Sequence, residues 1–234
     1  MMSHKGRGWR LAALAAVAVS ALAIGVAVPA ASAAGGPVMP GNAKSHGWSL
    51  TDMTKAVAPF TTSGNDPGQY PQTPFQILFV NFDTVTFGTP NGGLVITGTN
   101  VFRVGSGTPF YVPMLNSDDS VPLIGDFPPP PGGEVDYFFG ASQAGASAQL
   151  IVDGRATPIG EAYLTGPVTA SLLNGGTQIM TLGAFLTPLA PGRHTVRILG
   201  GFSGAAIQPA TGFAFVNFDL TYTVNVTPGR NSQP

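Results

Sequence analysis

The clearest pattern in the chain is a strict alternation of apolar and polar residues near its C-terminal end. From Val216 to Val226 every second residue is apolar, and the residues between them are Asn, Asp or Thr. This period of two is typical of a β-strand with one buried face and one solvent-facing face. Asp219 is the only charged residue in the segment, so the solvent-facing side of the predicted strand is polar but almost uncharged.

Shorter segments of strand character occur from residue 75 onward. They comprise residues 75–79, 94–104, 135–139, 148–152, 177–186 and 194–199. Turn residues separate them, and Asp153-Gly154 is a pair preferred in two-residue hairpin turns. Short strands with such regular punctuation are typical of a sandwich or barrel. The pattern predicts an all-β fold over residues 75–228: an antiparallel β-sandwich of about ten strands, of the jelly-roll or immunoglobulin-like type.

One segment before the strands has helical character instead. Ser49 is suited to cap a helix, Asp52 places a negative charge in its first turn, and apolar residues recur at helical spacing. Pro59 is expected to end the helix, which predicts a helix over residues 50–58 within an otherwise flexible leader, residues 34–74. A helix this short is marginal in water, so we expect it to dock on the sandwich.

The N-terminal segment has the layout of an export signal. Three basic residues precede an apolar run over residues 11–28, Pro29 interrupts the run, and the small residues Ala-Ser-Ala end at Ala33. This order predicts a signal peptide over residues 1–33, cleaved near Ala33, and therefore a secreted, extracellular protein of bacterial type. A retained membrane anchor is the alternative, because the run is just long enough to span a bilayer. No later apolar run has that length, so we expect no membrane span in the mature protein.

Composition excludes several functional classes. Charged residues make up 9% of the chain, where globular domains usually carry about 25%. Beyond residue 33 the chain has more acidic than basic residues, which argues against nucleic-acid binding. It has no cysteine, so disulfides, thiolate metal sites and cysteine nucleophiles are excluded.

Acidic residues gather in one short stretch between predicted strands. Asp118, Asp119 and Asp126 supply hard carboxylate oxygens, which are the ligands that Ca²⁺ prefers. Their spacing matches no established calcium loop, and solvated loop acids are the alternative interpretation. A calcium site is therefore a weak hypothesis, and no other cofactor is predicted.

A short motif occurs twice in the chain. The sequence Phe-Val-Asn-Phe-Asp is found at residues 79–83 and again at residues 215–219. If the two copies were neighbouring strands, their Asn and Asp side chains would gather on one face and offer a second weak calcium hypothesis. Alternatively, the two copies are separate strands that need the same pattern of buried and solvent-facing residues.

No combination of residues predicts catalysis. A serine hydrolase needs a nucleophile, a base and an orienting acid, but Ser142 lacks the second glycine of the Gly-x-Ser-x-Gly motif. His194 is in phase with the apolar residues of its predicted strand, so we expect it to point inward and to be structural. Gly192, Asp153 and Gly154 are likewise predicted to be structural turn residues. No catalytic residue is predicted.

Two arginines are expected on the opposite face of the strand that carries His194. Arg193 and Arg197 alternate with the inward-facing positions of this strand. On a solvent-facing sheet surface they could hold an anionic partner. Alternatively, they could pair with Asp219 or another acid on a neighbouring strand, which contributes roughly 0.2–1 kcal/mol.

The segment that contains His194 also carries a family resemblance. Leu189 to Ile198, with Pro191-Gly192 followed by Arg193-His194-Thr195, resembles the Pro-Gly-(Lys/Arg)-His-Thr hairpin of a group of uncharacterised secreted bacterial β-sandwich proteins. Residues 107–113 and 218–226 are similar to other segments of the proteins in that group. The resemblance implies an exported β-sandwich and implies no activity and no catalytic residue.

These observations predict an exported, non-enzymatic protein with a binding or structural role at the cell surface or in the medium. Its partner is expected to be a cell-surface or carbohydrate ligand that the residues do not identify. A secreted hydrolase that uses Asp and Glu on a polysaccharide is one alternative. A calcium-stabilised binding module is the other.

Overall fold

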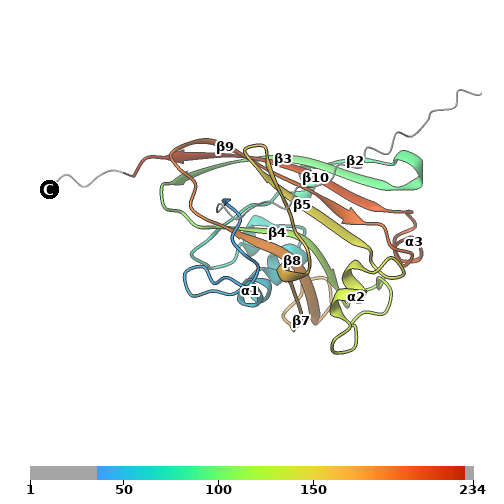
Figure 1. Ribbon diagram of the computed structural model, residues 1–234. Helices are drawn as coiled ribbons and strands as arrows, with labels where there is room; N and C mark the ends of the chain where they lie inside the picture. The colour runs from blue at the N-terminus through green and yellow to red at the C-terminus, as the bar shows by residue number, and fades with distance from the viewer. Residues whose placement is uncertain (1–35, 230–234) are drawn as a thin grey trace, which may run out of the picture. The chain divides into compact units, whose positions relative to one another are not determined.

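The computed structural model describes residues 36–229 of the 234-residue chain. The predicted signal peptide, residues 1–33, and its cleavage site at Ala33 lie outside the described residues. Within residues 36–229, ten strands form two sheets, and three α-helices and several short 3-10 turns connect them (Figure 1). None of the helices in this range has the length and apolar character needed to cross a membrane.

The larger sheet has six strands in the order β2-β3-β10-β9-β5-β6. Their bounds are β2 Thr86–Gly88, β3 Leu94–Gly105, β5 Ala146–Val152, β6 Arg155–Pro158, β9 Gly192–Phe202 and β10 Val216–Thr227. β10 is the long alternating segment expected from the sequence. It runs antiparallel to β9 and parallel to β3, over twelve residue pairs from Val216↔Leu94 to Thr227↔Gly105.

The smaller sheet has four strands in the order β1-β4-β8-β7. Their bounds are β1 Gln76–Ile77, β4 Phe110–Asp118, β7 Leu164–Thr169 and β8 Gln178–Leu186. β1 runs parallel to β4. Both sheets are therefore mixed, and the prediction of a purely antiparallel sheet was wrong. Alternation along a strand specifies which face is buried but carries no information on the direction of its neighbour.

The main apolar core lies between the two sheets, as expected for a β-sandwich. Val112 and Leu182 contribute to it from the smaller sheet, and Ile198, Leu220 and Val224 contribute from the larger one. Alternate residues of β10 point into this core, and the residues between them face outward. The period of two that was visible in the sequence therefore follows directly from burial on one side of the larger sheet.

The smaller sheet is buried on both faces because helix α1, Leu50–Thr62, covers its outer side (Figure 1). Tyr111 and Phe185 pack against this helix, whereas Val112 and Ala184 beside them point into the inter-sheet core. All residues of β8 after Gln178 are buried. Burial on both faces explains why β8 reads as a continuous apolar run and not as an alternation.

Helix α1 begins as predicted and ends later than predicted. The Ser49 hydroxyl accepts the Asp52 backbone N–H at 3.2 Å, and the Asp52 carboxylate accepts the Ser49 N–H at 2.9 Å, which forms a capping box. Pro59 does not end the helix, which continues to Thr62. Proline removes one backbone donor, and the Thr62 hydroxyl donates to the Ala58 carbonyl at 2.7 Å in the same turn.

Two predicted strands adopt other structures. Residues 135–139 belong to helix α2, Glu134–Phe139, in which Tyr137 and Phe138 are buried. The first copy of the repeated motif contains a 3-10 turn, Phe82–Thr84, in place of a strand. The third helix, α3 Ile207–Thr211, connects β9 to β10.

Part of the predicted leader is bound to the smaller sheet. The Met39 N–H donates to the Phe185 carbonyl at 2.9 Å, and the Thr187 N–H donates to the Pro37 carbonyl at 2.8 Å. Val38 forms a bridge with Leu186 between these two bonds. The backbone of residues 37–39 is thus hydrogen-bonded to the C-terminal end of β8.

Candidate functional site

The three acidic residues proposed as calcium ligands lie at the loop ends of the smaller sheet. Asp119 accepts the backbone N–H groups of Thr177 and Gln178 at 2.5 and 2.9 Å and the Thr177 hydroxyl at 2.7 Å. Burial disfavours its charge, but these hydrogen bonds outweigh burial and lower the pKa of Asp119. Asp119 therefore fastens the start of β8 to the end of β4.

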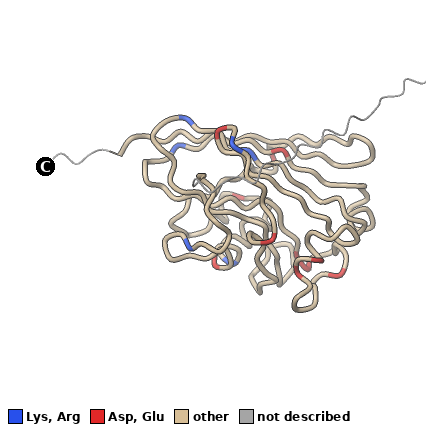
Figure 2. The backbone as a smooth tube through the Cα atoms, in the orientation of Figure 1, with Lys and Arg blue, Asp and Glu red and all other residues tan. Residues whose placement is uncertain are grey.

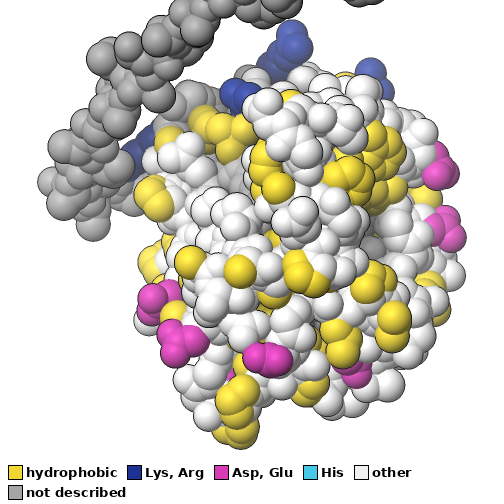
Figure 3. All heavy atoms as spheres, turned by 90° about the vertical axis from the view of Figure 1, so that its right-hand side faces the viewer, with side chains coloured by type: hydrophobic (Ala, Val, Ile, Leu, Met, Phe, Trp, Pro, Cys, Tyr) yellow, Lys and Arg dark blue, Asp and Glu magenta, His cyan; other side chains and the backbone are white. Residues whose placement is uncertain are grey.

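The other two acids have different partners. Asp118 accepts the Ser120 hydroxyl and backbone N–H and the Asn174 amide, and Asp126 accepts the Gln143 amide at 2.8 Å. Within residues 36–229 no three His, Asp or Glu side chains are grouped as metal ligands would be. On the face drawn in Figure 3, uncharged and hydrophobic groups separate acidic side chains from one another. Each of the three candidate carboxylates accepts a hydrogen bond from another segment of the chain.

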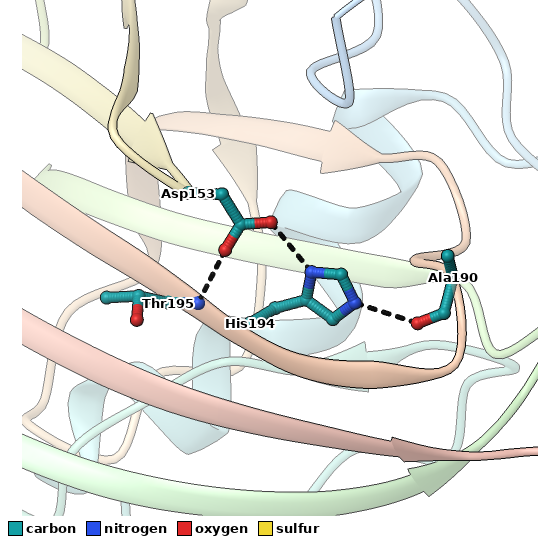
Figure 4. Close-up of polar contacts among 4 residues, drawn as sticks. All are labelled: Asp153, Ala190, His194 and Thr195. Carbon is teal, nitrogen blue, oxygen red and sulfur yellow. Dashed lines mark hydrogen bonds and ion pairs between the residues drawn. The ribbon is translucent and has the colours of Figure 1, made fainter.

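His194 lies near the start of β9 and joins the turn between β5 and β6 to the segment that precedes β9 (Figure 4). Its Nδ1 lies 2.7 Å from the Asp153 carboxylate, and its Nε2 lies 2.7 Å from the Ala190 carbonyl. The second Asp153 oxygen accepts the Thr195 backbone N–H at 2.8 Å. As predicted, Asp153 and Gly154 form the two-residue turn between β5 and β6, with φ of +49° and +80°.

The surroundings of His194 favour its charged form. Both partners of the ring, a carboxylate and a carbonyl, are hydrogen-bond acceptors, so the two bonds form together only when both ring nitrogens carry protons. The hydrogen bond to Asp153 is the main cause of a raised pKa for His194, and burial opposes it. A ring with both nitrogens engaged cannot serve as the general base of a hydrolase in this arrangement.

The outer face of the larger sheet is polar. Arg197 donates from Nε and Nη2 to the two oxygens of Asp219 at 2.7 and 2.6 Å, and this pairing lowers the pKa of Asp219. Of the two alternatives that the sequence left open for these arginines, Arg197 adopts the pairing with Asp219. A shallow groove beside the pair is lined by Thr84, Thr86, Thr97, Thr99 and Thr221. Figure 2 shows basic residues on the strands of this sheet.

A cavity of about 320 Å³ lies between the sheets. Its walls come from β4, from β10, from the end of β9 and from the segments that follow α1 and β1. The pairing of β4 with β8 shifts register between Pro113 and Leu115, and residues 113–116 line the cavity at this irregularity. A bulge bends its strand locally, so this irregularity lies where the space between the sheets is not filled.

The cavity lining is apolar and uncharged. Ten of its fifteen residues are apolar, and none of the fifteen is Lys, Arg, Asp, Glu or His. Four of the apolar residues are phenylalanines, namely Phe79, Phe82, Phe202 and Phe218. Both copies of the repeated motif contribute, although they are not neighbouring strands: β10 pairs with β3 and β9. The hypothesis of a shared Asn and Asp face between the two copies is therefore wrong.

Tyr222 is the one titratable residue of the lining. It is 1% exposed, and within residues 36–229 its hydroxyl forms no hydrogen bond. Its ring contacts Phe102 edge-on, with centroids 5.9 Å apart, and Phe102 contacts Phe79 in the same way at 5.8 Å. Burial raises the pKa of Tyr222, so the hydroxyl remains protonated over the physiological range.

Two other polar residues of the lining, Thr61 and Asn65, have partners in the protein, whereas Asn116 is exposed and its side chain bonds no described residue. The Thr61 hydroxyl donates to the carbonyls of the last turn of α1, at 3.2 Å to Val57. The Asn65 amide donates to the Val80 carbonyl at 2.9 Å and ties the loop after α1 to the segment that follows β1. Thr61 and Asn65 therefore shape the wall of the cavity, and Tyr222 is the buried lining group whose hydroxyl is free.

Sequence reasoning did not identify this cavity. It placed Tyr222 correctly on the buried face of the last strand but treated it as one apolar residue among six. The available signal was the Tyr222 hydroxyl on the otherwise apolar buried face of β10. A buried tyrosine hydroxyl usually has a hydrogen-bond partner, so its position could have indicated a polar contact there. Comparison with other proteins adds no functional assignment: no protein-family model matches the chain, and no curated protein matches it.

Proposed function

We propose that this chain is an exported, non-enzymatic protein that binds a small, uncharged, apolar molecule in the cavity between its two sheets. Export is inferred from the signal-like pattern of residues 1–33. The cavity is the observation that carries the proposed binding function. The framework is taken as a jelly-roll or immunoglobulin-like sandwich in a variant form with two parallel strand pairs, β1–β4 and β3–β10.

The size and chemistry of the cavity support this ligand class. Small-molecule pockets usually enclose about 300–1,000 Å³, so a volume of about 320 Å³ suits a compact ligand. Moving an ion into an apolar site without a partner is costly, and the lining has no charged side chain to compensate. The aromatic residues of the lining favour flat or ring-shaped molecules.

The lining supports binding better than catalysis. Hydrolysis of a polysaccharide needs two carboxyl groups facing each other across the substrate, and the cavity lining contains none. Asp118, Asp119 and Asp126, which were the acidic candidates, bind loop donors outside the cavity. Tyr222 is protonated and has no neighbouring base among the lining residues.

A neutral fluorescent probe tests the proposed function. N-phenyl-1-naphthylamine becomes brighter in an apolar environment, and we expect it to bind the purified protein with a saturable increase in fluorescence. Met114→Trp fills part of the cavity and should weaken binding at least tenfold. Leu173→Trp, which adds the same ring at an exposed position, should leave binding unchanged.

Circular dichroism shows whether each variant keeps the β-rich fold. Leu220→Phe makes a smaller addition to the cavity wall and serves as the test if Met114→Trp does not fold. Equal probe affinities in the wild-type protein and in a folded cavity-filling variant would contradict binding in the cavity. Absence of any saturable binding to the wild-type protein would contradict the proposed function itself.

A second candidate is supported by the threonine-lined groove on the outer face of the larger sheet. Hydroxyl groups beside a bidentate Arg197–Asp219 pair are suited to hydrogen-bond the hydroxyls of a carbohydrate. A glycan and cell-wall pull-down with the wild-type protein and with Thr99→Val and Thr221→Val tests this candidate. Capture that is unchanged by the two substitutions would contradict a carbohydrate site in the groove.

A further inference from the structure

We infer that the cavity selects ligands that carry one hydrogen-bond acceptor, a carbonyl or ether oxygen, which accepts a hydrogen bond from the Tyr222 hydroxyl. This inference rests on the proposed function, because it names the ligand class for the same cavity. It adds a polar recognition element to a site that is otherwise apolar.

The first support is the free hydroxyl itself. Two other tyrosine hydroxyls among the described residues have partners: Tyr137 bonds Ser117 at 2.6 Å and the Ile124 carbonyl at 2.9 Å, and Tyr70 accepts the Ile77 N–H at 2.8 Å. The Tyr111 hydroxyl has none, but Tyr111 does not line the cavity. Tyr222, which is 1% exposed, has none among the described residues. A hydroxyl without a partner in the protein is available to a ligand that supplies an acceptor, and the hydrogen bond adds affinity.

The second support is that the hydroxyl is held in place. Tyr222 lies in the middle of β10, which has a strand on each side, and its register partners are Val196 and Asn100. The edge-on contact with Phe102 restricts rotation of the ring. A donor fixed by rigid neighbours loses little freedom when it binds, which makes its hydrogen bond more selective.

The third support concerns the direction of the bond. Because burial keeps the hydroxyl protonated, it can always donate. A charged acceptor such as a carboxylate is disfavoured by the uncharged apolar walls. A neutral oxygen attached to a compact apolar body satisfies both conditions.

A matched pair of ligands separates this inference from the proposed function. Indane and 1-indanone have the same fused-ring skeleton and differ by one carbonyl oxygen. Their dissociation constants are measured by displacement of N-phenyl-1-naphthylamine from the wild-type protein. We expect 1-indanone to bind about tenfold more tightly than indane, which is the effect of one hydrogen bond worth about 1.4 kcal/mol.

Two substitutions test whether the preference for 1-indanone over indane depends on the Tyr222 hydroxyl. Tyr222→Phe should reduce the tenfold preference to roughly one, mainly by weakening 1-indanone binding. Tyr111→Phe is the control, because the Tyr111 hydroxyl is also buried and near Thr54 but has no hydrogen bond, and Tyr111 does not line the cavity. This variant should keep the preference.

The outcomes are distinct. Equal binding of indane and 1-indanone to the wild-type protein, or a preference that survives in Tyr222→Phe, overturns the inference and leaves apolar binding in the cavity intact. Failure of both ligands to displace a probe that does bind also overturns it, since neither would then reach Tyr222. Failure of the probe to bind is the separate result that rejects the proposed function.

Discussion

The two faces of the smaller sheet are packed in different ways. On its outer face, α1 and the sheet enclose a cluster in which Phe75 and Tyr111 contact Phe185 with ring centroids 5.0 and 5.6 Å apart. On its inner face, a larger cluster contains the cavity. Each cluster includes a buried tyrosine with a free hydroxyl, Tyr111 outside and Tyr222 inside. Only the second hydroxyl belongs to a residue that borders open space.

The comparison of the two faces indicates that the cavity results from irregularities in the strands that border it. β4 shifts register at Pro113, and the chain leaves β1 after two strand residues to form a 3-10 turn at residues 82–84. These two irregularities separate the walls where regular strands would have brought them together.

The largest expected effect compares a phenylalanine from each region. Phe60 is 0% exposed on the buried face of α1, and Phe60→Ala should lower the free energy of unfolding by about 3–5 kcal/mol because it opens a void in a filled cluster. Phe218→Ala, at the cavity, should cost less than half as much because that ring already borders empty space. Urea unfolding followed by circular dichroism measures both. Equal costs would remove the distinction between the two regions.

An intermediate effect compares tyrosines with and without partners. Tyr137→Phe leaves the buried Ser117 hydroxyl without a partner and should cost about 1–3 kcal/mol of stability. Tyr222→Phe removes a hydroxyl that bonds nothing in the protein, so its stability should be unchanged or slightly higher. Thermal unfolding of the two variants without ligand checks this. A large loss in Tyr222→Phe would show that its hydroxyl has a structural partner.

The smallest expected effect concerns the His194–Asp153 contact at the edge of the larger sheet. It is a change in the pH dependence of stability. The pKa of His194 is raised by folding, so its contribution is complete below the unfolded pKa near 6.5 and is lost as pH rises through the folded pKa. Asp153 has a lowered pKa, so its contribution is lost only at acidic pH. Between pH 6 and pH 9 the wild-type protein should therefore lose up to about 1 kcal/mol relative to Asp153→Asn.

Asn tolerates the positive φ of position 153, so this substitution keeps the turn while it removes the charge. The comparison is made by urea unfolding at several pH values. An identical pH dependence of the wild-type protein and the variant would show that the His194–Asp153 contact does not contribute to stability.

The sequence predicted best where one local rule acts alone. The alternation of β10, the helix cap at Ser49 and the Asp153-Gly154 turn each depend on residues that are close in the chain, and all three are confirmed. The length of α1 was underestimated because the local effect of Pro59 was outweighed by packing of the helix on the smaller sheet.

The remaining features depend on distant segments and could not be predicted in this way. Residues 135–139 alternate like a strand, yet they form helix α2, which buries the adjacent residues Tyr137 and Phe138. The repeated motif at residues 79–83 has the composition of β10 but no neighbouring strand to pair with in the same way. The cavity arises from residual space between five parts of the chain, and no pattern within any one of them contains it.

The parallel pairing of β3 with β10 has a consequence for how the chain acquires its structure. The two strands are about 120 residues apart in the chain, and among the described strands β10 alone is hydrogen-bonded to both the β2–β3 hairpin and the β9–β5–β6 group. Contacts between such distant segments form slowly because a long loop must close first. The larger sheet therefore cannot be completed until the last strand has been synthesised. A chain whose last strand has not yet been synthesised therefore remains incompletely folded. This would suit the proposed export, because a chain must be unfolded to pass through a translocation channel.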